Sequence, residues 1–384
     1  MISRKKAIIY GVILVAITFM LTSTFNIVLG GKVVISKDTY EAYKKYNKMI
    51  ALEELVKEDF YKKTSDEELV NSAIKGMFSG LGDPYSQYYT KAEFEKLKEQ
   101  TSGSFVGIGV YISPASDDDN ITIIAPIDGS PAQKSGIKPG DKILQVDGKV
   151  VSSKNSDEAI ALIKGKKGTE VELTIKRGEQ ILDIKVKRDE IVSKTVEEKL
   201  LEDNIGYIKI TSFSEHTNKE FKNALNILKK DDIKGLVIDL RDNPGGLLNV
   251  CKDIADSLIG EGTIVYTKDN KGNTEYLKSD NKKLGLPIAV LTNEGSASAS
   301  EILTGAIIDN KAGISVGTTT FGKGLVQSVR ELKDGTGFKL TTAQYFTPNG
   351  DYINGKGIKP TIEEKDQEKQ LDTAVKWVKE QIHK

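Results

Sequence analysis

Gly235-Leu236-Val237-Ile238-Asp239-Leu240 is a nearly continuous apolar run, and a polar, glycine-rich segment follows it directly at 241–246. A strand that is apolar at almost every position is typical of a parallel sheet whose two faces are both buried. The same pattern returns at 287–291. Helices with apolar residues on one face are predicted around these strands, at 218–229, 247–259 and 300–309. The alternation predicts an α/β layer fold for residues 191–365.

The bulk composition limits the possible functions. A chain of 384 residues is expected to fold as two or three domains. The 55 Lys and Arg residues balance the 55 Asp and Glu residues, which argues against a nucleic-acid partner because phosphate binding requires a basic surface. One cysteine, Cys251, excludes an intrachain disulfide framework. With only two histidines besides, a Cys- or His-based metal site is implausible.

The N-terminus predicts a membrane anchor. Arg4, Lys5 and Lys6 precede an uncharged stretch at 7–31, and about 20 apolar residues span a bilayer. By the positive-inside rule we expect a cytoplasmic tail at 1–6, a single-pass anchor in the cell membrane at 7–31, and the remaining chain outside the cytoplasm. The alternative is a cleaved signal peptide, although no A-x-A-like site follows the stretch.

Three further regions flank the α/β domain. Residues 32–100 alternate charged and apolar residues at helical spacing and predict a helical region. Residues 101–190 predict a small β-rich domain, and 366–384 an amphipathic C-terminal helix. The helices could mediate a homodimer, but their apolar faces could equally pack within one chain.

The loop after the strand at 287–291 is the first candidate site, because sites in open α/β sheets gather at the carboxyl ends of strands. It consists mostly of very small residues that would let a substrate backbone approach closely. Ser298 in this loop could attack a carbonyl group, and the amide of Ala299 could hold the resulting oxyanion. The alternative is structural, because Ser298 and Glu301 have the spacing of a capping box.

The loop after Val316 supplies a candidate general base. Lys323 is the only charged residue between Lys311 and Arg330. If this apolar, Gly-flanked loop is buried, desolvation should lower the pKa of the lysine and make it a workable base. Gln327 follows four residues later, and on an extended strand it would share a face with Lys323 and could orient the amine. The alternative for Lys323 is a solvated loop lysine, and the alternative for Gln327 is an ordinary polar residue on a strand.

The glycine pair after Leu240 is the third candidate. Gly245 and Gly246 precede a predicted helix and could supply a second oxyanion donor. A tight strand-to-helix turn is the plain alternative, and the pattern is not a nucleotide-binding one. A triad built on His216 is disfavoured because the chain has no G-x-S-x-G motif.

These motifs together resemble those of the carboxy-terminal processing peptidases, or tail-specific proteases, in serine peptidase family S41. The resemblance covers nearly everything after 31 and rests on several motifs in the same order. The motifs are Gly82-Asp83-Pro84-Tyr85-Ser86, Leu240-Arg241-Asp242-Asn243-Pro244-Gly245-Gly246, Gly295-Ser296-Ala297-Ser298-Ala299-Ser300-Glu301, Phe321-Gly322-Lys323-Gly324 with Gln327, Tyr345-Phe346-Thr347-Pro348-Asn349-Gly350, and Gly357-Ile358-Lys359-Pro360.

The resemblance implies a ClpP- or crotonase-like core and a role for each loop. Ser298 would be the nucleophile, Lys323 the general base and Gln327 its positioning residue. The Ala299 amide and an amide of Gly245 or Gly246 would hold the oxyanion, and no metal or cofactor is implied.

Residues 101–190 resemble a PDZ domain. Gly107, Ile108 and Gly109 would then bind the carboxylate of protein or peptide substrates with free C-termini. Two alternatives remain on the sequence: a non-catalytic, membrane-tethered PDZ adaptor, and an acyl-CoA-type enzyme on a crotonase-like core.

Overall fold

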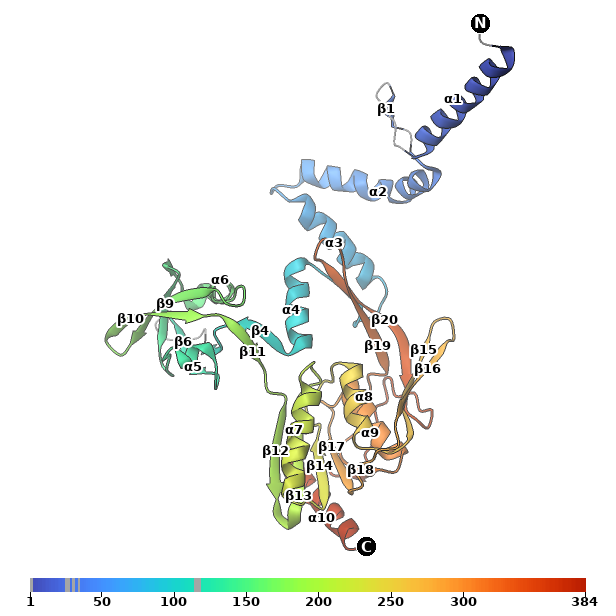
Figure 1. Cartoon of the computed structure of the whole chain (residues 1–384). Helices are drawn as coiled ribbons and strands as arrows, with labels where there is room; N and C mark the ends of the chain where they lie inside the picture. The colour runs from blue at the N-terminus through green and yellow to red at the C-terminus, as the bar shows by residue number, and fades with distance from the viewer. Residues whose placement is uncertain (1–2, 25–27, 30–31, 34, 114–118) are drawn as a thin grey trace. The chain divides into compact units, whose positions relative to one another are not determined.

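The computed structural model describes residues 3–24, 28–29, 32–33, 35–113 and 119–384 (Figure 1). The chain divides into two compact units, Met1–Met77 and Phe78–Lys384. The chain folds into the mixed α and β structure that the sequence predicts.

The first unit is helical. It contains α1 (Arg4–Thr24), α2 (Lys37–Asp59), most of α3 (Asp66–Ser79), and the short strands β1 (Val28–Leu29) and β2 (Lys32–Val33). Ser36 caps α2 by accepting a hydrogen bond from the Thr39 amide, and α2 itself has no buried side chain among the residues described.

No helix that is long and apolar enough to cross a membrane is found in the described part of the chain. The anchor predicted at 7–31 lies partly outside that part, at 25–27 and 30–31.

A six-stranded sheet forms the centre of the second unit. Its order is β12-β13-β14-β17-β18-β21, and all neighbours are parallel except the β12–β13 pair. Every residue of β14 and β17 is buried, as expected from their apolar runs. The strands are β12 (Val196–Leu201), β13 (Ile205–Ile210), β14 (Gly235–Asp239), β17 (Ile288–Thr292), β18 (Gly313–Gly317) and β21 (Ile362–Glu363).

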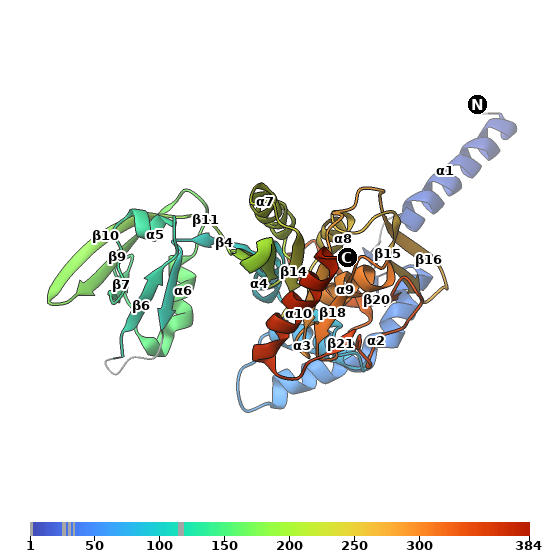
Figure 2. The ribbon, with the colours of Figure 1, turned by 90° about the horizontal axis from the view of Figure 1, so that it is seen from below.

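Helices cover both faces of this sheet. On one face, α7 (Thr217–Lys230), α8 (Leu248–Asp256) and α9 (Ala299–Asp309) share an apolar core with residues such as Ile238. On the other, α10 (Gln367–Ile382) packs on Val237 through Ala374 and Val378. Figure 2 shows α10 beside β18, which it also contacts.

A second sheet carries the strand that follows the lysine loop. Its order is β16-β15-β20-β19, and β3 adds to β20 with Tyr88 opposite Phe338. After β3 comes α4, whose first turn is closed by a capping box between Thr90 and Glu93. The elements are β3 (Gln87–Tyr89), α4 (Lys91–Ser102), β15 (Gly262–Asp269), β16 (Thr274–Ser279), β19 (Leu325–Glu331) and β20 (Gly337–Phe346).

The β-rich segment forms a separate small sheet with its own apolar core. Its strand order is β10-β9-β7-β6-β5, with β8 on β7, so β5 is an edge strand. A ribbon of β4 (Ser104–Gly107) and β11 (Asp189–Val192) joins this segment to its neighbours in the chain. The remaining elements are β5 (Val110–Ser113), β6 (Ile121–Pro126), α5 (Pro131–Lys134), β7 (Lys142–Val146), β8 (Lys149–Val150), α6 (Ser156–Ile163), β9 (Glu170–Arg177) and β10 (Gln180–Lys187).

Candidate active site

Ser298 lies in the turn between β17 and α9. It is the N-cap residue of α9, half-buried, with φ 54° and ψ −112°. A positive φ in a non-glycine residue is unfavourable, and such strain is concentrated at functional sites. The capping box of the structural alternative is present: the Ser298 amide donates to Glu301 Oε2 at 2.8 Å, and the Ser298 side chain faces the Glu301 amide. No full-strength capping hydrogen bond from the Ser298 side chain is found within the described residues.

The glycine-rich turn after β14 lies against this serine. A Cβ atom built on Gly245 would come within 2.8 Å of Ser298 Cβ and 2.9 Å of the Ala299 nitrogen. Gly245 also has φ 99°, so two independent constraints require glycine here. The parallel strands β14 and β17 are adjacent, which is why their following loops meet at one edge of the sheet.

The backbone amides near Ser298 differ in what they bind. The Gly245 amide donates to Asn243 Oδ1 at 2.9 Å and is therefore occupied. The amides of Gly246 and Ala299 have no hydrogen-bond acceptor among the described residues. The sequence does not choose between the two glycines as oxyanion donors. In the structure only the Gly246 amide is available for that role among the two.

Lys323 lies in the loop between β18 and β19. It is half-buried, and its amine lies over the ring of Tyr85, 4.7 Å from the centroid. Burial lowers the pKa of Lys323, and the neighbouring positive charge of Lys339 lowers it further. Asp83 and Glu301 act in the opposite direction, but the net shift is downward. No hydrogen bond between Lys323 Nζ and Ser298 Oγ is found in the described chain.

Glu301 ties the serine loop to the lysine loop. Its carboxylate is fully buried. Besides the Ser298 amide, it accepts hydrogen bonds from the amides of Gly322 (2.7 Å) and Lys323 (2.9 Å) and from the Thr320 hydroxyl (2.6 Å). The Tyr345 hydroxyl is a fifth donor, at 3.4 Å from Oε2. One buried acid thus fixes the backbones that carry both candidate side chains, and the five donors stabilise its negative charge.

Gln327 does not orient Lys323 in this structure. Its amide donates to Leu325 O at 3.2 Å and to Thr341 Oγ1 at 3.3 Å. The even-spacing argument does not hold because β19 begins only at Leu325 and has an irregularity between Val326 and Gln327.

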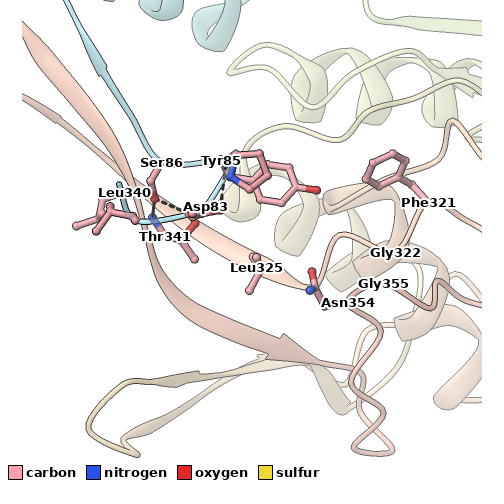
Figure 3. A pocket seen from close by; sticks show the side chains of 13 residues that line it. Asp83, Tyr85, Ser86, Phe321, Gly322, Leu325, Leu340, Thr341, Asn354 and Gly355 are labelled. Atoms are coloured by element: carbon pink, nitrogen blue, oxygen red, sulfur yellow. Dashed lines mark hydrogen bonds between the residues drawn. The ribbon is translucent and has the colours of Figure 1, made fainter. Parts of the chain in front are cut away.

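The segment 83–86 lies beside the lysine loop (Figure 3). Asp83 accepts hydrogen bonds from the Ser86 hydroxyl (2.5 Å) and the Tyr85 amide (3.1 Å), and Ser86 Oγ accepts from the Thr341 amide. Burial raises the pKa of Asp83, but these hydrogen bonds and Lys323 hold it below its usual value. Figure 3 shows the Tyr85 ring extending from this turn toward Phe321, on the wall of a neighbouring pocket of about 800 Å³.

A cavity of about 550 Å³ brings the predicted residues together. Its walls come from α4, the loops after β13, β14, β17 and β18, and the β19–β20 hairpin. All six residues predicted from the loops line it: Gly245, Gly246, Ser298, Ala299, Lys323 and Gln327. Lys339 also lines it.

Sequence reasoning did not identify Glu301, Tyr85 or Lys339 as site residues. Glu301 could have been found, because it is the only acid in the apolar first three turns of α9. Tyr85 belongs to the motif at 82–86, but neither that motif nor the sequence around Lys339 indicates a place in the site, because both residues reach it through tertiary packing. In the described chain, no group of three or more His, Cys, Asp or Glu residues is placed to hold a metal ion.

Comparison with known proteins gives three family matches. They are Peptidase family S41 at 204–364, a PDZ domain at 96–176, and the Activating protease CtpB N-terminal domain at 26–93.

Individual relatives agree with these matches. The chain is 42% identical over 358 residues to the carboxy-terminal processing protease CtpA of Bacillus subtilis (strain 168), covering 92% of this chain and 75% of that protein. It is 43% identical over 321 residues to a probable CtpA-like serine protease of Staphylococcus aureus (strain bovine RF122 / ET3-1), covering 82% of this chain and 64% of that protein. The solved photosystem II D1 C-terminal processing protease matches with a TM-score of 0.50 and 28% identity, over 87% of this chain and 94% of that one.

Proposed function

Because this chain belongs to peptidase family S41 and is a serine peptidase of the carboxy-terminal processing type, we propose that Ser298 and Lys323 are its catalytic pair. The supporting observation is their meeting in one cavity. A half-buried serine in a strained turn and a half-buried lysine of lowered pKa line it, together with backbone amides that have no acceptor among the described residues.

In the proposed reaction, Ser298 Oγ attacks the carbonyl carbon of a peptide bond. Neutral Lys323 accepts the hydroxyl proton, and the amides of Ala299 and Gly246 stabilise the oxyanion. Lys323 then gives the proton to the leaving amine, and water releases the acyl group by the same steps. Lys323 must leave the Tyr85 ring to reach the serine, a rotation that its flexible four-carbon stem allows.

We further propose that the PDZ domain recruits substrates through their free C-termini at residues 107–109. The carbonyls of Ile108 and Gly109 accept hydrogen bonds from Ala132 and Ile127. Their amides have no acceptor within the described residues and are available to a carboxylate. The adjacent strand β5 is at the edge of its sheet and can pair with an extended peptide.

The proposed location is the cell membrane, with the catalytic part outside the cytoplasm. The proposal rests on the basic residues 4–6 and the uncharged stretch 7–31. Fractionation of cells expressing the full chain tests it: the protein should remain with membranes after an alkaline carbonate wash, whereas a chain lacking 1–31 should be released. Equal release of both proteins would contradict the anchor.

A peptide-cleavage assay on the purified chain tests the catalytic pair. Ser298→Ala and Lys323→Arg should each lower kcat/KM at least about 10³-fold. The first variant removes the nucleophilic hydroxyl, and the second replaces the amine with a guanidinium, which cannot act as a base. Lys333→Arg, on the exposed turn of the β19–β20 hairpin, should leave kcat/KM unchanged. Equal activity of wild type and Ser298→Ala would remove the nucleophile assignment. A chain that binds peptides without cleaving them would instead support the adaptor.

A further inference from the structure

The active-site cavity contains a second lysine that the proposed reaction does not use. Lys339 lies on β20, half-buried, across the hairpin from Val329. It lines the same cavity as Ser298 and Lys323. Within the described residues Lys339 forms no ion pair, so its charge is available to a ligand.

The charged side chains that line this cavity are all cationic. Lys323 and Lys339 are its two charged lining residues, and none of its described lining residues is Asp or Glu. Two acids outside this lining act on Lys323. Asp83 accepts hydrogen bonds from the Ser86 hydroxyl and the Tyr85 amide, and Glu301 is fully buried and bonded to backbone amides. A cleft lined by charges of one sign concentrates ligands of the opposite sign. The cavity therefore suits a substrate that carries a negative charge near the peptide group to be cut.

We propose that Lys339 binds a carboxylate of the substrate on the leaving-group side of the scissile bond, as a specificity-determining residue. The inference rests on the proposed function. Lys323 delivers its proton to the leaving amine, so the leaving half of the substrate lies on the Lys323 side of the cavity. Lys339 lies on β20, which pairs with β19, the strand that follows the Lys323 loop, and it lines the cavity with Lys323, so it lies on this side as well. The carboxylate can be the C-terminus itself or an Asp or Glu side chain close to the cut.

The charge of Lys339 also affects the protonation of Lys323. Burial and Lys339 lower the pKa of Lys323, whereas Asp83 from the turn before β3 and Glu301 from α9 raise it. The Tyr85 ring is in contact with the amine. Removing the charge of Lys339 should therefore raise the pKa of Lys323 and move the acid limb of kcat/KM to higher pH.

The test compares three peptides of one sequence on wild type, Lys339→Gln and Lys339→Arg. One peptide has a free C-terminus near the cut, the second is amidated, and the third is amidated but carries Glu on the leaving side. Wild type should cleave the first about 10-fold better than the second in kcat/KM. Lys339→Gln should lose this preference and show the shifted acid limb, and Lys339→Arg should retain both wild-type properties. Cleavage of the third peptide shows whether a side-chain carboxylate substitutes for the C-terminus.

The outcomes separate this inference from the proposed function. If the C-terminus of the substrate also binds elsewhere on the chain, that binding raises kcat/KM equally in wild type and Lys339→Gln. It therefore cancels when the preferences of the two enzymes for the free C-terminus are compared. Full preference for the carboxylate in Lys339→Gln, with an unshifted acid limb, would overturn the role of Lys339 while cleavage still depends on Ser298. Absence of Ser298-dependent cleavage of every peptide by wild type would overturn the proposed function instead. Should Lys339→Gln fold poorly, Lys339→Met provides the same loss of charge.

Discussion

At the scale of single residues, the environment of Lys323 decides whether the proposed chemistry can run near neutral pH. A free lysine has a pKa of about 10.4 and is almost fully protonated there. Partial burial and the charge of Lys339 both disfavour the protonated amine, and they outweigh the attraction of Asp83 and Glu301. Burial and a neighbouring cation thus shift the pKa of Lys323 in the direction that the proposed role as a base requires.

The pH profile of kcat/KM follows from this lowered pKa. Only neutral Lys323 can accept the Ser298 proton, so activity should fall as pH drops below the pKa of Lys323. The midpoint of that limb should lie below about 10.4, the value of free lysine. Steady-state kinetics across the acid and neutral range measure it. A rate that stays constant deep into the acid range contradicts a lysine base.

Glu301 should act on catalysis through the two loops that it joins. Glu301→Gln keeps the size of the side chain but places an NH2 donor among five donors and removes the negative charge. We expect kcat to fall about 100-fold from misplacement of the reacting groups. Because Glu301 raises the pKa of Lys323, the remaining activity should have its acid limb at lower pH, opposite to Lys339→Gln. A wild-type kcat in this variant would show that the carboxylate is dispensable.

At the scale of elements, the buried strands could be predicted from the sequence and several others could not. β14 and β17 are apolar at nearly every position because both of their faces are covered. β16 has mostly exposed residues, and its mixed composition gives no period-2 signal. The candidate loops could be located because they follow buried strands. The Tyr85 contact could not be predicted, because it depends on the pairing of β3 with β20. In that pairing Gln87 lies opposite Lys339, 252 residues later in the chain.

The docking of α10 on β14 gives a prediction at this scale. A Cβ atom on Gly235 would come within 2.2 Å of Val378 Cγ1, so the strand and the helix fit only without that side chain. Gly235→Ala should destabilise the chain by about 1–3 kcal/mol through overpacking, and Val378→Ala by about 2 kcal/mol through a cavity. The double variant should lose less than the sum, because each change relieves the other. Thermal unfolding of the four proteins measures this, and additive losses would contradict the contact.

At the scale of the whole molecule, the proposed recognition site and the proposed catalytic site lie on segments with separate apolar cores. The β-rich segment packs its own cluster of buried residues, distinct from the two clusters on the faces of the central sheet. A substitution in the β-rich segment should therefore leave the core of the α/β segment intact, and the reverse should also hold. A defect in recognition should accordingly appear in peptide binding even when Ser298→Ala has removed turnover.

Two glycines of the PDZ domain give a matched test of this separation. Gly109 and Gly129 both have positive φ, 76° and 72°, so an alanine at either position meets similar backbone strain. Only at Gly109 would the new Cβ collide, 2.6 Å from Ser130 Cβ, whereas at Gly129 nothing lies within 4 Å. In the Ser298→Ala background, Gly109→Ala should weaken binding of a peptide with a free C-terminus about 10-fold or more, and Gly129→Ala by less than about 2-fold. Fluorescence anisotropy with free and amidated peptides measures both. Equal affinities in the two variants would mean that residues 107–109 do not bind the carboxylate, and the site of C-terminal recognition would then have to be sought in the catalytic cavity beside Lys339.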